Sequence, residues 1–276
     1  MLDKFIFENH RGLRFNGLEN GVYMNYSTIR DYNWSYDAIN GKISRFYNKI
    51  TSRKIPLVVV GKTGDEAIAA MNRLHELAEA DIVDNLPGKI IVGEYYTNCF
   101  ITGSKKANYL ISKRHSRIDL TITSDDPAWY RDRMHHFVPG ANDPSSIGGG
   151  TDYPYDYAYD YSVAQNGRKI ISDAVGNSAF KIKIYGEATN PEIIINGHVY
   201  AVTGTIGKGE TLLIDGLNKK ITLTTAAGEK VNWFDKRNRE SYIFEPIKPG
   251  SNVVTWGGSF GFELTVVEKR SEPRWT

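Results

Sequence analysis

Two short glycine and lysine motifs are the first residues that suggest chemistry, because they resemble phosphate-binding loops. Residues 58–65 read Val-Val-Val-Gly-Lys-Thr-Gly-Asp, between a strand-like and a helical run. A phosphate-binding loop also needs a glycine five residues before its Gly-Lys pair, where this chain has Pro56. In residues 204–209, Gly209 stands where a serine or threonine should hold magnesium. Residues 61–63 are therefore predicted to be a plain strand-to-helix turn, and no nucleotide site is expected.

Histidine and cysteine form no catalytic or metal-binding pattern either. His75 and Glu79 are one helical turn apart, but the zinc-protease motif needs a second histidine at position 79, so they are predicted to pair on the helix surface. His135 and His136 are adjacent, and neighbouring side chains of a strand point apart. Cys99 is the only cysteine, which excludes an internal disulfide and predicts a small buried residue. We therefore expect no enzyme activity, no metal and no cofactor.

A tyrosine repeat at residues 151–162 is the most distinctive stretch of the sequence. It reads Thr-Asp-Tyr-Pro-Tyr-Asp-Tyr-Ala-Tyr-Asp-Tyr-Ser, and a period of two is that of an extended strand. Pro154 lacks a backbone donor, which favours an edge strand or a straight arm. An aromatic face of this kind needs an apolar wall, so we expect packing between domains or subunits. The residues are Tyr153, Tyr155, Tyr157, Tyr159 and Tyr161.

Two alternatives for these aromatic residues remain open. Tyrosine and tryptophan can stack on sugar rings, so the tyrosine repeat, Trp233 and Trp256 keep a saccharide-binding module under consideration. The tryptophans could instead lie in a core, and the repeat could be an ordinary strand or a disordered linker. Hydrolysis of sugars is not indicated by Asp156 and Asp160, which would lie about 13 Å apart on a strand. Glycosidase carboxylates are about 5–9.5 Å apart.

The composition limits the remaining possibilities. With 276 residues, 41% hydrophobic and 12% aromatic, the chain is expected to form two domains with real cores. A net charge of +2 is too small for a nucleic-acid surface. Residues 1–7 carry charge within a short apolar run, unlike a secretory signal. No apolar run approaches the roughly 20 residues that cross a bilayer.

Residues 1–140 are predicted to form a β-rich domain with one helix, an α+β arrangement. Residues 63–66 fit a capping box, and the helix should end near Asp81. Asn40-Gly41 predicts a two-residue hairpin turn. The expected apolar face of the helix comprises Ile68, Met71, Leu74, Leu77 and Ala78. Strands are expected at 4–8, 21–26, 32–36, 43–50, 54–60, 89–92, 98–101, 109–113 and 117–124.

A glycine- and proline-rich stretch at 138–150 predicts the boundary between two domains. We expect a first domain at 1–140, a joint at 141–151, and a second domain at 152–276 that begins with the tyrosine arm. Strand candidates in the second domain recur about every ten residues, which is typical of a two-sheet antiparallel sandwich. They lie at 169–172, 180–185, 192–195, 198–202, 211–215, 220–224, 231–234, 241–244, 252–256 and 260–267.

Four features together resemble the distal tail protein family of phages with long non-contractile tails, the hub at the tail tip. The chain opens with Lys-Phe-Ile-Phe-Glu at 4–8, and the tyrosine repeat follows a glycine-rich joint. Residues 186–197 read Gly-Glu-Ala-Thr-Asn-Pro-Glu-Ile-Ile-Ile-Asn-Gly. The fourth feature pairs Gly-Glu-Thr-Leu-Leu-Ile-Asp-Gly at 209–216 with Phe-Glu-Pro-Ile-Lys-Pro-Gly-Ser-Asn-Val-Val at 244–254. These features span nearly the whole chain.

The resemblance implies a mainly β structural protein whose first domain forms a ring, hexameric in this family, that joins the tail tube to the baseplate. It also implies a galectin-like β-sandwich as the second domain, and it supplies no catalytic residues. Expected partners are further copies of the chain, the tail tube protein and other tail-tip or baseplate proteins. The expected location is the virion tail, after synthesis in the bacterial host cytoplasm, in a phage or a prophage-derived particle.

We expect strands of the first domain to close the ring and the tyrosine arm to clamp the sandwich to it. The main alternative is an adhesion module whose sandwich binds a saccharide of the host surface. A cell-wall glycosidase ranks below both.

Overall fold

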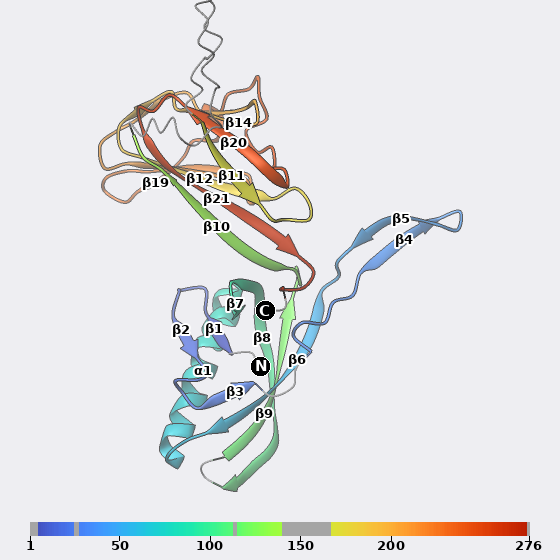
Figure 1. Cartoon of the computed structure of the whole chain (residues 1–276). Coiled ribbons are helices and arrows are strands. Elements are labelled where there is room, and N and C mark those ends of the chain that lie inside the picture. The colour runs from blue at the N-terminus through green and yellow to red at the C-terminus, as the bar shows by residue number, and fades with distance from the viewer. Residues whose placement is uncertain (1–4, 25–27, 113–114, 140–166, 275–276) are drawn as a thin grey trace, which may run out of the picture. The chain divides into compact units, whose positions relative to one another are not determined.

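The computed structural model describes residues 5–24, 28–112, 115–139 and 167–274 (Figure 1). The chain divides into two compact units, Met1–Arg131 with Arg270–Thr276, and Asp132–Lys269. Both units are built from antiparallel strands, and α1 (Gly64–Asp84) is the one α-helix of the described ranges. The mainly β fold class expected from the sequence is therefore confirmed. Within the described ranges, no helix has both the length and the apolar character that a membrane crossing requires.

The division between the units lies inside a strand. β10 (Trp129–Phe137) supplies its residues up to Arg131 to the first unit and those from Asp132 to the second. We had expected boundaries at 140/141 and 151/152, because glycine and proline commonly mark linkers. β10 contains neither glycine nor proline, so its composition does not indicate that the two units divide within it. The expected joint at 141–151 and the tyrosine arm that follows it lie within 140–166, outside the described residues.

The first unit is one curved sheet in the order β2-β1-β7-β8-β9-β6-β3, with β10 also paired to β8. β8 links the two halves, since Cys99 pairs with Gly88 of β7 and Phe100 pairs with Thr123 of β9. Sequence reasoning split β8 into two strands and missed β10. The bounds are β1 (Ile6–Glu8), β2 (Arg14–Asn16), β3 (Val22–Met24), β6 (Thr51–Val60), β7 (Gly88–Val92), β8 (Tyr95–Ser112) and β9 (His115–Ser124).

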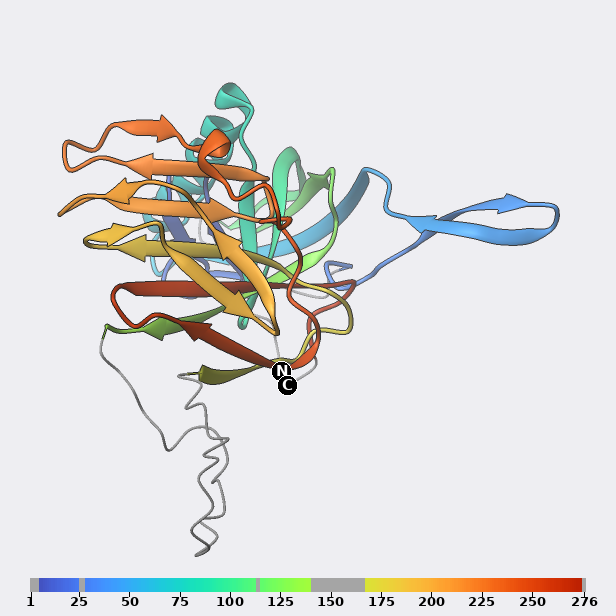
Figure 2. The same cartoon turned by 90° about the horizontal axis from the view of Figure 1, so that it is seen from above.

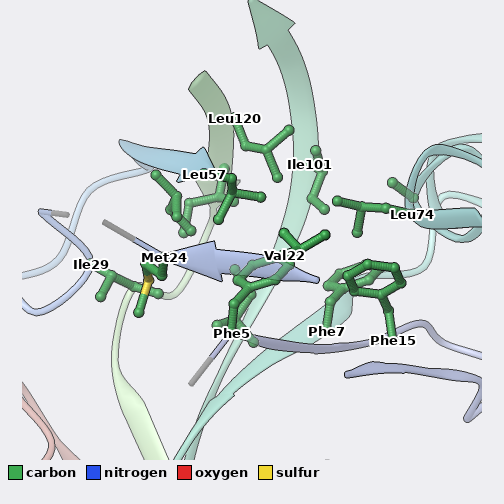
Figure 3. Close-up of a cluster of buried hydrophobic side chains, with 14 of the residues drawn as sticks. Phe5, Phe7, Phe15, Val22, Met24, Ile29, Leu57, Leu74, Ile101 and Leu120 are labelled. Atoms are coloured by element: carbon green, nitrogen blue, oxygen red, sulfur yellow. The ribbon is translucent and has the colours of Figure 1, made fainter. Parts of the chain in front are cut away.

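The core of this unit combines aromatic and aliphatic side chains. Phe5, Phe7 and Phe15 are buried, and Phe5 meets Phe15 edge to face at 6.3 Å. Figure 3 shows these rings beside aliphatic side chains from the strands and Leu74 of α1. Cys99 is 1% exposed in the same cluster, as expected of a small core residue.

α1 begins as the sequence predicts and presents the predicted apolar face except at Ile68. The Thr63 hydroxyl accepts the Glu66 N–H at 3.2 Å, while the Glu66 carboxylate accepts the N–H of Lys62 rather than that of Thr63. The helix ends three residues beyond Asp81, at a left-handed Asn85. Ile68, expected inside, is 54% exposed. The buried positions are Ala67, Ala70, Leu74, Leu77, Ala78 and Asp81, and Met71 packs partly buried against the same core.

A buried acid fastens the end of α1 to the loop between β1 and β2. Asp81 is fully buried, and its Oδ1 lies 2.6 Å from His10 Nδ1 and accepts the His10 backbone N–H at 2.9 Å. His10 Nε2 lies 2.9 Å from Asp84. Gly88 makes room for this contact, since a Cβ atom there would stand 2.2 Å from Asp81 Oδ2. Charge and close packing therefore both hold the helix end in place.

The second unit is a two-sheet antiparallel sandwich, as predicted. One sheet runs β19-β18-β17-β12-β21-β10 and the other β11-β20-β14-β15, with Phe180, Leu212, Val254 and Phe262 buried in the sandwich core. The strands are β11 (Gly167–Ser172), β12 (Ala179–Tyr185), β14 (Glu192–Ile195), β15 (His198–Ala201), β17 (Thr211–Asp215), β18 (Lys220–Thr224), β19 (Lys230–Asn232), β20 (Gly250–Trp256) and β21 (Gly261–Arg270). A small ladder joins β13 (Ala188–Thr189) to β16 (Thr205–Ile206).

One predicted strand of the second unit, at 241–244, is replaced by irregular structure, and the one predicted at 231–234 is displaced to β19. β19 ends at Asn232 and is followed by the short 3-10 helix η2 (Phe234–Lys236). Residues 241–244 form a turn in which Ile243 and Phe244 are buried and Tyr242 is exposed. The short apolar run at 242–244 can anchor a turn as well as it can form a strand, so its pattern does not distinguish the two.

The His10→Ala variant is expected to lower the free energy of unfolding of the first unit by about 3 kcal/mol. The physical reason is that a buried carboxylate left without its partner costs roughly 3–5 kcal/mol. Arg11→Ala is the control, because Arg11 is 57% exposed and its pair with Asp84 should contribute under about 1 kcal/mol. Urea denaturation followed by circular dichroism measures both. Equal effects of the two variants would contradict the assignment.

The thiol of Cys99 is expected to report unfolding of the first unit. Burial raises the pKa of this thiol to about 12, so almost no reactive thiolate exists at pH 8 in the folded protein. Because Cys99 is the only cysteine, a disulfide reagent reads one site. We expect labelling of the native protein to be at least about 100-fold slower than labelling in guanidinium, from the pKa difference. Similar rates in both conditions would show that Cys99 is accessible.

Candidate interaction surface

A β-hairpin of the first unit stands apart from the rest of that unit. β4 (Ser35–Ile39) and β5 (Lys42–Tyr47) are joined by Asn40 and Gly41, whose φ angles are 51° and 77°. Positive φ at both central positions is the requirement of the hairpin turn that Asn-Gly favours, so the predicted turn is confirmed. We call residues 35–47 the hairpin arm.

The hairpin arm has no sheet to lie on within the described residues. β4 and β5 form a sheet of their own, paired only with each other. Figures 1 and 2 both show the pair leading away from the other strands of its unit. Large apolar side chains are left in solvent: Tyr36 is 59% exposed, Ile39 65%, Ile43 53% and Phe46 58%. Solvent exposure of this many neighbouring apolar side chains is typical of an interaction site.

One face of the hairpin arm is apolar. Tyr36 pairs with Phe46 and Ala38 with Ile43, and residues two apart on a strand point to the same side. A bulge near Asp37 and Ala38 keeps the two pairs on this side. The rings of Tyr36 and Phe46 meet edge to face at 6.4 Å. The face is therefore ordered by its own contacts before anything covers it.

Basic side chains lie on the opposite face of the hairpin arm, where Arg45 pairs with Asp37 and Lys42 with Ile39. Arg45 and Lys49 lie over the ring of Tyr47, at 5.9 and 5.7 Å from its centre. Residues 35–49 hold Lys42, Arg45 and Lys49 against one acid, Asp37. The surrounding charge is therefore positive, which favours a partner with acidic groups beside an apolar patch.

A second exposed apolar group lies at the end of α1. Ile82 is 47% exposed, Val83 76% and Leu86 51%, and we call these three residues the helix-end patch. The last turn of α1 has no basic residue, and Asp84 lies there. The partial negative charge of a helix C-terminus adds to that of the acid. Asp84 pairs with Arg11, so the negative character of the helix-end patch comes mainly from the helix terminus.

The tyrosines and tryptophans singled out from the sequence differ in where they lie. The five tyrosines Tyr153, Tyr155, Tyr157, Tyr159 and Tyr161 lie outside the described residues. Trp256 packs against the sandwich core, with its ring 5.3 Å from Phe137 and its Nε1 donating to the Phe260 carbonyl at 3.1 Å. Trp233 is also partly buried against this core. The tryptophans are therefore packing residues rather than an open sugar platform.

The structure describes all the histidines that the sequence singled out. Within the described residues, no three His, Cys, Asp or Glu side chains cluster as metal ligands would. His136 Nδ1 lies 3.2 Å from Glu263. Burial, together with the positive charge of Lys106, lowers the pKa of His75. His75 Nε2 has no hydrogen-bond partner, so the expected pair with Glu79 is not formed. Residues 61–63 form the turn between β6 and α1, as predicted.

The sequence predicts only part of the structure of the hairpin arm. Its turn was predicted from Asn40-Gly41, but its exposure was not, because alternating apolar residues normally indicate a strand with one buried face. The available signal was the density of charged and aromatic residues on both strands. Whether another sheet covers the side chains of the hairpin arm depends on residues that are distant in the sequence.

Comparisons with known proteins connect this architecture to phage tails. No protein-family model matches the sequence, and no curated protein matches it either. Solved structures do match. The SPP1 Dit protein, described as a paradigm of the hub adsorption apparatus in phages that infect Gram-positive bacteria, has a TM-score of 0.59 and 11% identity. The alignment covers 98% of this chain and 100% of that one.

Two structures of the phage p2 baseplate in its activated conformation match as well. The structure with Ca has a TM-score of 0.61 and 12% identity, and the one with Sr has 0.62 and 13%. Each covers 99% of this chain and 100% of the matched chain. Over nearly its whole length, this chain therefore has the fold of the phage Dit and baseplate proteins, as its sequence resemblance predicted.

Proposed function

We propose that this protein is a non-enzymatic structural component of a phage tail, whose first unit assembles with further copies into a ring between tail tube and baseplate. The hairpin arm is the observation that carries the proposal. An isolated two-stranded hairpin is marginally stable at best in water. Burying one exposed Ile or Phe contributes about 1.5–3 kcal/mol. Association with a neighbouring copy therefore stabilises the hairpin arm by covering apolar side chains that its own unit leaves exposed.

A ring also needs two different surfaces on each copy, because every subunit meets one neighbour on each side. We propose that the hairpin arm of one copy lies on the helix-end patch of the next. The apolar face of the arm then covers Ile82, Val83 and Leu86, and the net positive charge of the arm is attracted by the negative end of α1. The edge strands β2 and β3 have three residues each and offer little backbone for pairing with a neighbouring copy.

The finer parts of this proposal rest on the family resemblance. A ring of six copies, a galectin-like second unit, and the tail tube and baseplate proteins as partners all follow from it. The SPP1 and p2 proteins are described as hub and baseplate components, which supports a place in the virion tail of a phage or prophage-derived particle. We also propose that the tyrosine arm, Tyr153 to Tyr161, packs between domains or subunits.

Adhesion is the second candidate function. A hollow on the sandwich, lined by aromatic and basic side chains, favours binding of a saccharide by the second unit. A scaffold and an adhesion module are compatible, because the hollow lies in the second unit and the hairpin arm belongs to the first.

Replacing Tyr36 and Phe46 by aspartate is expected to abolish the ring without unfolding the first unit. Both side chains are exposed, so the substitution removes no core contact but places charge in the proposed interface. Light scattering and electron microscopy measure assembly, and circular dichroism checks the fold. The control places aspartate at Ile171 and Val175, two exposed apolar residues of the second unit. Rings of the same size in the Tyr36 and Phe46 variant would refute the role of the hairpin arm.

A mixing experiment tests whether the interface joins two different surfaces. Val83→Asp alters the helix-end patch and should also prevent ring closure. In a mixture with the hairpin variant, one intact surface of each kind remains, so we expect heterodimers and no larger species. Native mass spectrometry of the mixture identifies them. Self-association of Val83→Asp into rings would show that the hairpin arm binds elsewhere.

A further inference from the structure

The second unit has an open hollow of about 540 Å³ beside the turn that joins β17 to β18. Its other wall is the irregular segment after η2, where sequence reasoning expected a strand. Tyr242 is the exposed aromatic residue of the wall, with 54% of its surface in solvent. Phe244 lies behind it, 4% exposed, with the two rings edge to face at 6.0 Å. The hollow therefore presents an aromatic face on a buried aromatic support.

Cations are held at the rim of this face by defined contacts. Lys219 Nζ donates to the Tyr242 hydroxyl at 2.9 Å. The Arg237 guanidinium lies over the Phe234 ring at 4.1 Å and donates to the Phe234 carbonyl at 2.7 Å. A stacked and hydrogen-bonded guanidinium loses little further entropy when its remaining N–H groups bind an anion. With Arg239, three cations line the hollow against one acid, Glu240.

The backbone at Lys219 is unusual for the residue it carries. Its φ is +56°, a left-handed conformation that costs non-glycine residues about 1–3 kcal/mol. The turn is held there by Asp215, whose carboxylate accepts the N–H groups of Leu217 and Asn218 at 3.0 and 2.9 Å. Glycine would adopt this conformation freely. The chain instead keeps a lysine whose ammonium group points to Tyr242, and the strain suggests a use for that charge.

We propose that this hollow binds an acidic saccharide, with a sugar ring on Tyr242 and its carboxylate or phosphate group on Lys219, Arg237 and Arg239. An aromatic platform alone would take a neutral sugar, and cations alone would take any anion. Their combination selects a ring that carries negative charge, because charge complementarity adds to apolar contact. The inference rests on the second proposed function, and the ring proposal does not depend on it.

The experiment titrates the full-length protein with three probes by isothermal calorimetry. One is a glucuronate-containing tetrasaccharide, one a glycosylated poly(ribitol phosphate), and one neutral maltotetraose. We expect one or both acidic probes to bind, more weakly as salt is added, and maltotetraose to bind at least about tenfold more weakly. The two acidic probes separate carboxylate from phosphate as the preferred group. Absence of binding by both, or equal binding of maltotetraose, would overturn the proposal.

Two variants connect binding to the hollow. Lys219→Gly removes the charge and relieves the backbone, so it should keep or raise the melting temperature while weakening acidic-probe binding at least about tenfold. Tyr242→Ala should weaken binding similarly. Lys208→Ala, an exposed lysine outside the hollow, is the matched control and should bind as the wild type does. Unchanged binding by Lys219→Gly would refute the site. Light scattering of the same samples reads ring assembly separately, so the two proposals fail independently.

Discussion

A two-stranded hairpin cannot bury its own apolar face, and the proposed assembly of this protein follows from that constraint. Within one sheet, a side chain is shielded only by what lies on its face of the sheet, and the described residues place nothing on the hairpin arm. The exposed rings of Tyr36 and Phe46 therefore favour association. A head-to-tail contact repeated around an axis can satisfy every copy, whereas a monomer leaves each arm in water.

The rest of the first unit fixes the position of the end of α1. Its core joins a curved sheet to α1, and the contacts of Asp81 and His10 fix the end of the helix close to the strands. The helix-end patch, the proposed binding site for the arm, therefore lies beside a helix end that is fixed to the β1–β2 loop. Buried polar contacts are modest evidence for stability, but they specify geometry, which a ring of identical contacts requires.

The second unit shows the opposite use of structure. Its two sheets bury a large apolar core, and the irregular segment after η2 presents Tyr242 beside the strained Lys219. A sandwich that carries an open, charged hollow suits recognition of a small part of a larger surface. The likeness to Dit and baseplate proteins concerns the fold alone, and a function belongs to such local sites rather than to the fold.

The sequence by itself determined the mainly β class, the sandwich strands, the start of α1 and the Asn40-Gly41 turn, because these depend on residues close together in the chain. The tyrosine repeat remains a prediction. Only the tertiary structure decided that β8 is one strand, that Ala67 rather than Ile68 faces the core, that Tyr242 lies on a turn, and that the hairpin arm is uncovered. Each of these depends on which distant residues cover a surface, and local periodicity carries no information about that.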